Sequence, residues 1–276
     1  MQTHKFGLTG KLVPIIGQGT WQIRKNGLDA LRAGIDLGMT HIDTAELYTG
    51  AEELVAEAVR GRREKIFLVS KVMPSNASYK GTLQACDASL KKLKTDYLDV
   101  YLIHWWSGSH PIAETMRAME ELVTAGKVRY IGVSNFDVDR LKKAQKALTR
   151  EKIVCNQVLY HLRSRGIENR LLPYCESENI AVVGYSPFGQ GDFPSSTSKQ
   201  GQALAAVAQR HDRTPRQIAL NFLTRRPSLF AIPKASTIEH VRENAGGEGF
   251  RLSAEDLRVI EGAFPLPGKD EPLDML

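Results

Sequence analysis

Four side chains of types that can jointly transfer a proton stand near the ends of short apolar segments. Asp43, Lys71 and His104 each end such a segment, and Tyr48 follows Asp43 by five residues. A phenol has an ordinary pKa of about 10, and a nearby Lys71 would lower the pKa of Tyr48 by favouring the phenolate. Asp43 would hold Lys71 charged, and His104 could orient a substrate oxygen. The group predicts a proton donor for an alkoxide; the simpler interpretation is a structural Asp43–Lys71 ion pair.

A carbonyl group becomes an alkoxide when it accepts hydride. No side chain supplies hydride, so this chemistry requires a redox cofactor. Charged residues at the ends of buried strands are costly unless they are paired, and three such ends in succession favour a functional cluster. We therefore interpret the four residues as the centre of an oxidoreductase site.

Eight short apolar segments are the strand candidates. Each is too short for a helix and lacks strict alternation of polar and apolar residues, which is typical of strands buried on both faces. They are Ile15–Gly19, Thr40–Asp43, Ile66–Lys71, Asp99–His104, Val128–Ser134, Ile153–Gln157, Ala181–Tyr185 and Leu229–Pro233. Amphipathic helical patterns separate them, and Asp137, Thr214 and Ser253 have the character of residues that begin helices.

The strict alternation of strand and helix predicts a parallel sheet. Eight units within about 250 residues predict a closed (β/α)8 TIM barrel, with an open doubly wound sheet as the competing architecture. A glycine turn within His4–Pro14 predicts a short N-terminal β-hairpin, and the proline-rich residues from Phe264 predict a short, irregular C-terminal tail. The loop Pro187–Gly201 is long enough to be functional. No internal boundary is evident, so we expect a single domain over residues 1–276.

Composition excludes several classes of protein. The 276 residues are 42% hydrophobic and 25% charged, with a net charge of +6, which is typical of a globular chain. No apolar run approaches the roughly 18 residues of a membrane helix, and no nucleic-acid-binding module is present, so we expect neither partner. Three cysteines without a C-x-x-C spacing exclude a disulfide scaffold and favour a reduced, cytoplasmic setting.

An ordered set of motifs gives a more specific indication. They are Gly19-Thr20-Trp21, His41–Tyr48, Ser70-Lys71, Leu98–Trp105, Gly132–Phe136, Asn156-Gln157, Gly184–Pro187 and Ile232–Lys234. In this order, from about residue 17 to 244, the sequence resembles the aldo-keto reductase family. The resemblance implies NADPH-dependent reduction of aldehydes or ketones to alcohols by a monomer.

The resemblance also implies roles for the four residues of the opening cluster. Tyr48 would be the general acid, and Lys71, paired with Asp43, would lower its pKa. His104 would orient the carbonyl oxygen of the substrate. Trp21 and Trp105 match apolar walls of the substrate pocket.

NADP(H) would lie extended across the mouth of the barrel. The resemblance implies that Ser134, Asn135 and Gln157 bind the carboxamide and that Tyr185 stacks on the nicotinamide. Ser186 and the loop after it would close over the pyrophosphate. Further cofactor-binding residues would be Gly19, Thr20, Asp43, Lys234 at the 2′-phosphate, Arg242, and Asn244 at the adenine.

Two departures from the family pattern bear on the cofactor. Ala235 stands where the family often has serine, and His240 stands where an arginine is common. Arg242 is close in sequence and could supply the missing positive charge. The preference for NADPH over NADH therefore rests mainly on Lys234. The short tail leads us to expect an open, permissive substrate pocket.

Four alternatives differ in the features they require. The segment Gly17–Gln22 begins like a Rossmann fingerprint but lacks its third glycine. A metal-dependent hydrolase could use His41 and Asp43, although no further histidines have ligand spacing. A Schiff-base lyase would need a neutral Lys71, which Asp43 opposes. A cofactor-sensing, non-catalytic regulatory member of the family is compatible with the same residues. We expect no bound metal.

Overall fold

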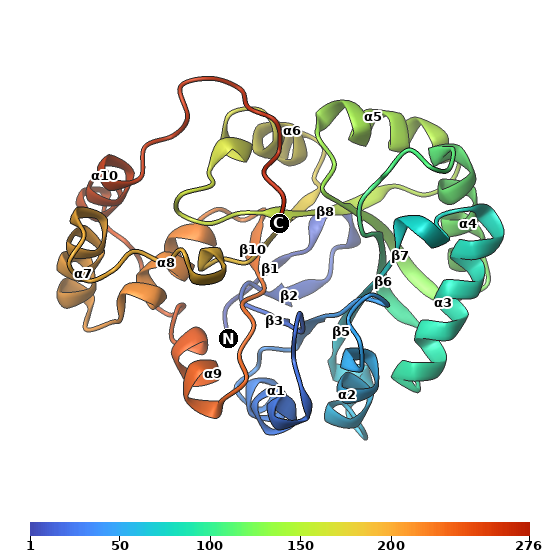
Figure 1. The fold of residues 1–276 in the computed structure, drawn as a ribbon, viewed down its shortest axis with the longest axis horizontal. Helices are drawn as coiled ribbons and strands as arrows, with labels where there is room; N and C mark the ends of the chain where they lie inside the picture. Colours follow the sequence, from blue (N-terminus) through green and yellow to red (C-terminus); the bar gives the residue numbers. More distant parts are fainter.

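The computed structural model describes residues 1–276 and contains eight parallel strands ringed by helices (Figure 1). The order of the strands in the sheet follows their order in the sequence. The strands are β3 (Gln18–Gly19), β4 (His41–Asp43), β5 (Phe67–Val72), β6 (Leu98–Ile103), β7 (Val128–Ser134), β8 (Ile153–Leu159), β9 (Ala181–Tyr185) and β10 (Leu229–Ala231).

Backbone hydrogen bonds close the sheet on itself. The N–H of Gly17 donates to the carbonyl oxygen of Ala231 at 2.8 Å, and the N–H of Ala231 donates to that of Ile15 at 2.9 Å. The segment before β3 therefore pairs with β10, and the predicted (β/α)8 barrel is confirmed over an open doubly wound sheet. β3 and β10 are shorter than predicted because their pairing at this seam is limited to isolated bonds.

Ten helices cover the outside of the barrel, so each strand is followed by at least one helix, as predicted. They are α1 (Leu28–Asp36), α2 (Ala51–Ala58), α3 (Tyr79–Leu93), α4 (Ile112–Thr124), α5 (Val138–Ala147), α6 (Leu171–Ser177), α7 (Lys199–His211), α8 (Pro215–Leu223), α9 (Ile238–Ala245) and α10 (Ala254–Ala263). None of them combines the length and the apolar character that crossing a membrane requires.

The predicted helix starts are confirmed. The side chain of Asp137 accepts a hydrogen bond from the N–H of Arg140 at the start of α5, and Thr214 and Ser253 form capping boxes at α8 and α10. One boundary differs from the prediction: α7 begins at Lys199, so the loop after β9 is shorter than predicted. Such caps satisfy backbone donors that the first helical turn leaves unpaired.

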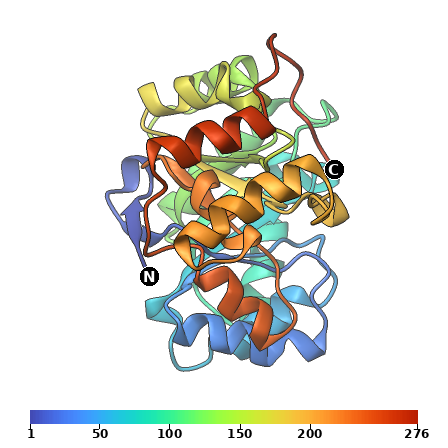
Figure 2. The ribbon, with the colours of Figure 1, turned by 90° about the vertical axis from the view of Figure 1, so that its left-hand side faces the viewer.

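The predicted N-terminal hairpin is present and closes one end of the barrel. Strands β1 (Thr3–Lys5) and β2 (Leu12–Pro14) pair antiparallel. Phe6 between them is fully buried, with its ring centre 4.8 Å from that of Phe67 and 4.9 Å from that of Phe230. Figure 2 places the hairpin and the C-terminal residues at opposite ends of the barrel, which leaves the far end free for a site.

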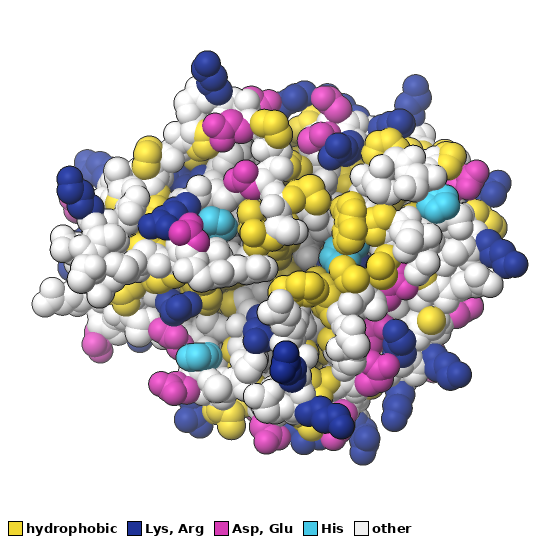
Figure 3. All heavy atoms as spheres, in the orientation of Figure 1, with side chains coloured by type: hydrophobic (Ala, Val, Ile, Leu, Met, Phe, Trp, Pro, Cys, Tyr) yellow, Lys and Arg dark blue, Asp and Glu magenta, His cyan; other side chains and the backbone are white.

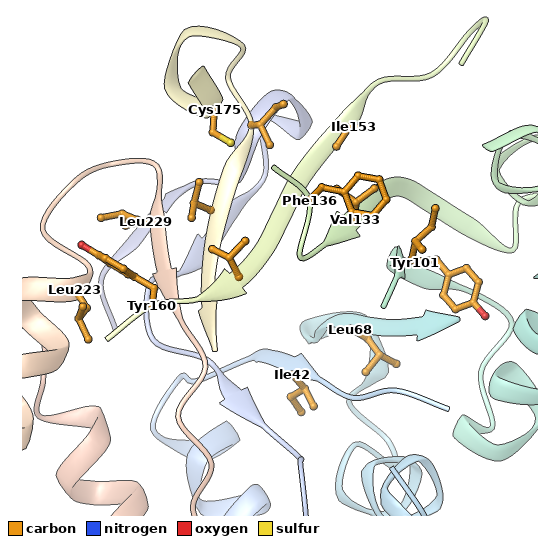
Figure 4. Packing of buried hydrophobic residues seen from close by; sticks show 14 of the residues in the cluster. Ile42, Leu68, Tyr101, Val133, Phe136, Ile153, Tyr160, Cys175, Leu223 and Leu229 are labelled. Atoms are coloured by element: carbon orange, nitrogen blue, oxygen red, sulfur yellow. The ribbon is translucent and has the colours of Figure 1, made fainter. Parts of the chain in front are cut away.

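Apolar side chains fill both faces of the strands. In β6, Val100 and Leu102 belong to a cluster inside the barrel, whereas Tyr101 and Ile103 pack against the helices. Figure 4 shows part of that outer cluster. Because successive strand residues point to opposite faces, burial of both faces explains the continuous apolar runs in the sequence.

The C-terminal tail is irregular, as predicted, and it returns to the end of the barrel opposite the hairpin. The side-chain amide of Asn169 donates to the carbonyl oxygens of Pro267 and Lys269, and the Ser164 hydroxyl donates to Asp274 at 2.5 Å. These hydrogen bonds direct the tail back over the centre of the barrel, where the chain ends in Figure 1. Long-range hydrogen bonds thus fix a segment that has no regular structure of its own, and the open substrate pocket stays a prediction.

Candidate active site

A cavity of about 790 Å³ opens at the C-terminal ends of the barrel strands. Figure 3 shows hydrophobic side chains gathered around a hollow at the centre of this face. Cavities of this size are typical of sites for small molecules and cofactors. The position is the one that the barrel architecture favours for catalysis.

Asp43 and Lys71 form a buried ion pair at the floor of the cavity. The Lys71 Nζ lies 2.5 Å from Asp43 Oδ1 and donates to the carbonyl oxygen of Thr44 at 2.8 Å. The amide of Gln157 donates to Asp43 Oδ2 at 2.7 Å. Both charged side chains are at most 2% exposed, so these hydrogen bonds replace the solvation that the charges lose.

The electrostatics of this pair keep the lysine charged. Burial alone would lower the pKa of Lys71, but the charge of Asp43 and the neighbouring Tyr48 outweigh it and raise that pKa above its ordinary value. Burial raises the pKa of Asp43, while Lys71 and Gln157 oppose this. A charged Lys71 cannot attack a carbonyl as a nucleophile, which counts against Schiff-base chemistry.

Tyr48 reaches the same floor from the loop between β4 and α2. Its hydroxyl lies 3.5 Å from His104 Nε2, and Lys71 Nζ lies 5.1 Å from the centre of its ring. Burial raises the pKa of Tyr48, and Lys71 lowers it by a smaller amount, so the pKa stands above 10. The predicted lowering of the pKa by Lys71 is present, but the loss of solvent around the phenol, which the sequence pattern does not reveal, outweighs it.

His104 is neutral in this setting. Burial, followed by the charge of Lys71, lowers its pKa to about 3. Its Nδ1 is buried without a hydrogen-bond partner, while its Nε2 faces the hydroxyl of Tyr48. An unsatisfied N–H is costly to bury, so we assign the proton to Nε2. His104 can then donate a hydrogen bond to an oxygen in the cavity.

Asn135 links three strands at the edge of the floor. Its backbone is in the left-handed region, with φ of +60°, which asparagine adopts more readily than most residues. Its amide nitrogen donates to Ser134 Oγ at 3.2 Å and to the His104 carbonyl oxygen at 3.3 Å. Its amide oxygen accepts from the Tyr185 hydroxyl at 3.1 Å. The residues that the sequence assigned to a carboxamide and a nicotinamide ring therefore lie beside one another.

The structure gathers most of the predicted site residues around this cavity. The lining includes Gly19, Thr20, Trp21, Asp43, Tyr48, His104, Trp105, Ser134, Asn135, Gln157, Tyr185, Ser186 and Lys234. Lys71 is fully buried behind Asp43 and does not line the wall. Arg242 and Asn244 lie on α9, outside the lining, and Asn244 is buried in that helix.

Several lining residues were missed in the sequence. They are Gln22, Leu47, Ile232, Pro233, Met275 and Leu276, whereas the further lining residues Pro187, Phe188 and Gln190 belong to the loop that was expected to close over the pyrophosphate. Most adjoin predicted residues in the chain, so their neighbours could have indicated them. Met275 and Leu276 carried no such signal, because they reach the site only through the return of the tail.

Two tryptophans stand at the rim, as expected of a substrate wall. The ring centre of Trp21 lies 5.0 Å from that of Tyr48, and the ring centre of Trp105 lies 5.0 Å from that of His104. Trp21 is 41% exposed. Aromatic surface of this kind, left accessible beside the proton-carrying groups, is suited to holding an apolar substrate.

His41 does not share a ligand site with Asp43. It is fully buried inside the barrel, where the rings of Phe6, Phe67 and Phe230 surround it. No three His, Cys, Asp or Glu side chains converge as metal ligands would. The site is thus defined by a buried Tyr–Lys–Asp–His cluster at the mouth of a parallel barrel.

Comparison with known proteins identifies the family. The model of the Aldo/keto reductase family matches residues 15–264. Methylglyoxal reductase YeaE of Escherichia coli (strain K12) is 44% identical over 285 residues, covering 100% of each chain. Glyoxal reductase of Bacillus subtilis (strain 168) is 34% identical over 258 residues, covering 91% of this chain and 89% of that one.

A solved structure supports the same family. An aldo-keto reductase from Klebsiella pneumoniae in complex with NADPH is 43% identical and superposes with a TM-score of 0.92, over 100% of this chain and 99% of the other. The chain belongs to the aldo/keto reductase family.

Proposed function

We propose that the protein is an NADPH-dependent reductase of aldehydes and ketones in which Tyr48 donates the proton. The observation that carries the proposal is the convergence of the Tyr48 hydroxyl, the neutral His104 and the buried Lys71–Asp43 pair on the floor of one cavity. Family membership and the NADPH complex of a similar structure support the same function.

The residues present fit a nicotinamide cofactor. The half-buried Tyr185 offers an aromatic ring inside the cavity, next to the amide of Asn135. Lys234, which also lines the cavity, offers a positive charge for a phosphate. Ser134, Asn135, Gln157 and Tyr185 would hold the nicotinamide, Ser186 the pyrophosphate and Lys234 the 2′-phosphate. When bound, NADPH supplies the hydride that no side chain can provide.

Side chains of the protein would bind the carbonyl oxygen of the substrate and protonate it. The His104 Nε2–H and the Tyr48 hydroxyl, 3.5 Å apart in the lining of the cavity, would act as two donors that bind and orient the carbonyl oxygen. As negative charge develops on that oxygen, Tyr48 transfers its proton. The positive charge of Lys71, fixed by Asp43, then stabilises the phenolate that remains.

We propose small aldehydes, including 2-oxoaldehydes, as substrates. Two similar proteins are named for the reduction of methylglyoxal and of glyoxal. The rim formed by Trp21 and Trp105 would accept an apolar or aromatic substituent beside the carbonyl group. Family membership is compatible with a wider set of ketones.

The test is consumption of NADPH, followed by its absorbance, with methylglyoxal, glyoxal and 4-nitrobenzaldehyde. We expect turnover with wild-type protein, and a kcat lower by roughly 100-fold or more for Tyr48→Phe because the variant has no proton to donate. NADPH binding, measured by protein fluorescence, should be unchanged in that variant. Carbonyl reduction by Tyr48→Phe at a rate near that of the wild type would contradict the proton-donor role.

We further propose that residues 1–276 form one domain that acts as a cytoplasmic monomer. The continuous core between the sheet and the helices supports a single unit. Cys86, Cys155 and Cys175 are buried and unpaired, which suits a reducing compartment. Light scattering of the purified protein would test the monomeric state.

A further inference from the structure

Glu46 makes a set of contacts that the catalytic cluster does not explain. It lies between Asp43 and Tyr48 on the loop that follows β4. Its carboxylate accepts a hydrogen bond from the backbone N–H of Met73 at 2.5 Å and another from the side-chain amide of Asn76 at 3.0 Å. Its own backbone N–H donates to the carbonyl oxygen of Lys71 at 3.3 Å.

These bonds join the loop that carries Tyr48 to the end of β5, which carries Lys71, and to the loop that follows β5. Tyr48 belongs to the loop after β4, whereas Lys71 lies near the end of β5, just before Met73 and Asn76. The paired register of β4 and β5 ends at Asp43 and Val69. Beyond that point, the carboxylate of Glu46 holds the loop after β5 against the loop after β4.

Glu46 stands behind the cluster and does not face the substrate or cofactor. It is absent from the lining of the cavity, whereas Tyr48 lines it. Its charged neighbours are Glu52 and Lys92 on the outer side of the barrel. A change at Glu46 should therefore act on the placement of Tyr48 and Lys71 without removing a contact to bound ligand.

We propose that Glu46 is a positioning residue that sets the placement of Tyr48 relative to Lys71 by fastening the loop after β5 to the loop after β4. The inference rests on the proposed function. Displacements of about 1 Å in such groups can cost a factor of roughly 100 in rate, so the effect should be seen in kcat.

Glu120 provides a matched control. Its carboxylate also fastens a loop, by accepting hydrogen bonds from the backbone N–H groups of Thr149, Arg150 and Glu151 at 2.8, 2.6 and 3.1 Å. That loop precedes β8, at the opposite end of the barrel from the cavity. Glu120→Ala should thus remove a similar clamp without touching the site.

The experiment compares Glu46→Ala, Glu46→Gln and Glu120→Ala with the wild type in the methylglyoxal and nitrobenzaldehyde assays. We expect kcat to fall roughly 10- to 100-fold in Glu46→Ala, while the Kd for NADPH stays within about twofold, since no ligand contact is lost. Glu46→Gln keeps an oxygen for the N–H of Met73, so it should restore kcat to within about threefold of the wild type. Glu120→Ala should lower the melting temperature and leave kcat unchanged.

The pH profile gives a second readout. The titratable groups that face Tyr48 are Asp43, Lys71, His104 and Tyr185. Because Lys71 lowers the pKa of Tyr48, a looser arrangement raises that pKa. The fall of kcat/KM at alkaline pH should then move to higher pH in Glu46→Ala and stay in place in Glu120→Ala.

The outcomes separate the two proposals. If Glu46→Ala lowers stability as Glu120→Ala does but keeps the kcat and the pH profile of the wild type, the positioning role is overturned and the proposed function stands. A loss of kcat in Glu46→Gln as large as in Glu46→Ala also overturns it. Absence of turnover by the wild-type protein overturns both proposals.

Discussion

The proton-transfer cluster combines opposing effects on single residues. Lys71 favours the phenolate of Tyr48, yet burial of the phenol raises its pKa by more. In the proposed reaction, the neutral tyrosine would keep its proton until negative charge develops on the substrate oxygen. His104 contributes a hydrogen bond without a charge, because burial and Lys71 lower its pKa to about 3. Each residue has a defined protonation state, which general acid catalysis requires.

Lys234 is the residue on which cofactor preference should depend. It is the one lysine or arginine that lines the cavity, whereas Arg242 lies outside the lining on α9. We expect Lys234→Ala to raise the KM for NADPH roughly tenfold or more, through loss of a charge-assisted hydrogen bond. The KM for NADH, measured in parallel, should change little. Equal increases for both cofactors would refute the assignment.

Among the elements, the alternation of side chains along each strand determines which residues reach the site. Asp43, Lys71, His104 and Gln157 all point into the barrel because side chains two residues apart share a face of a strand. The residues two positions earlier in the same strands, such as Val69 before Lys71 and Leu102 before His104, fill the interior of the barrel. The register pairs Asp43 with Val69 and Lys71 with Leu102, so the polar residues stand at the carboxyl ends of their strands, where Gln157 reaches Asp43.

The loop after β9 is held in place from outside the cavity. Phe188, which lines the cavity, and Phe193 pack edge to face. The guanidinium of Arg216 on α8 lies 4.7 Å from the first ring and 4.8 Å from the second. Such cation–π contacts each contribute about 0.5–1 kcal/mol at exposed sites, so Arg216 should keep this loop ordered.

We expect Arg216→Ala to raise the Kd for NADPH about fivefold, because a looser loop must be ordered when the cofactor binds. Arg213 is a suitable control, since it lies over Phe250, 5.4 Å from the ring centre, away from the cavity. Fluorescence titration of both variants would measure the difference. Equal affinities in Arg213→Ala and Arg216→Ala would argue against the role of the loop.

The whole barrel encloses two neutral histidines, and this makes its stability depend on pH. Burial lowers the pKa of both His41 and His104 to about 3, whereas histidine in an unfolded chain has a pKa of about 6.5. Between these values the unfolded chain binds more protons than the folded one. The stability from these groups is thus present above pH 6.5 and is lost as the pH falls toward 3.

The expected result is a melting temperature that falls steadily below about pH 6.5. The two ring nitrogens of buried His41 have no hydrogen-bond partner. In His41→Leu, an apolar side chain of similar size replaces this imidazole, so the melting temperature should fall less steeply with decreasing pH. Thermal unfolding between pH 7.5 and 4.5, followed by circular dichroism, would measure both slopes. Identical slopes would show that His41 does not contribute.

The barrel, the hairpin and the four candidate catalytic residues could be predicted from the sequence alone. Strand and helix periodicity are local, and the polar ends of Thr40–Asp43, Ile66–Lys71 and Asp99–His104 interrupt otherwise apolar runs. The ordered motifs added the family and its cofactor. These features could be predicted because each depends on residues that are close together in the chain.

Three features emerge only in the folded protein: the net shift in the pKa of Tyr48, the contacts of Glu46, and the place of Met275 and Leu276 at the cavity. Desolvation depends on every element packed around a group, and residue spacing does not reveal it. The tail has no periodicity, and hydrogen bonds to Ser164 and Asn169, about a hundred residues away, fix its course. Long-range contacts of this kind leave no local pattern, so they determine the pocket only once the chain has folded.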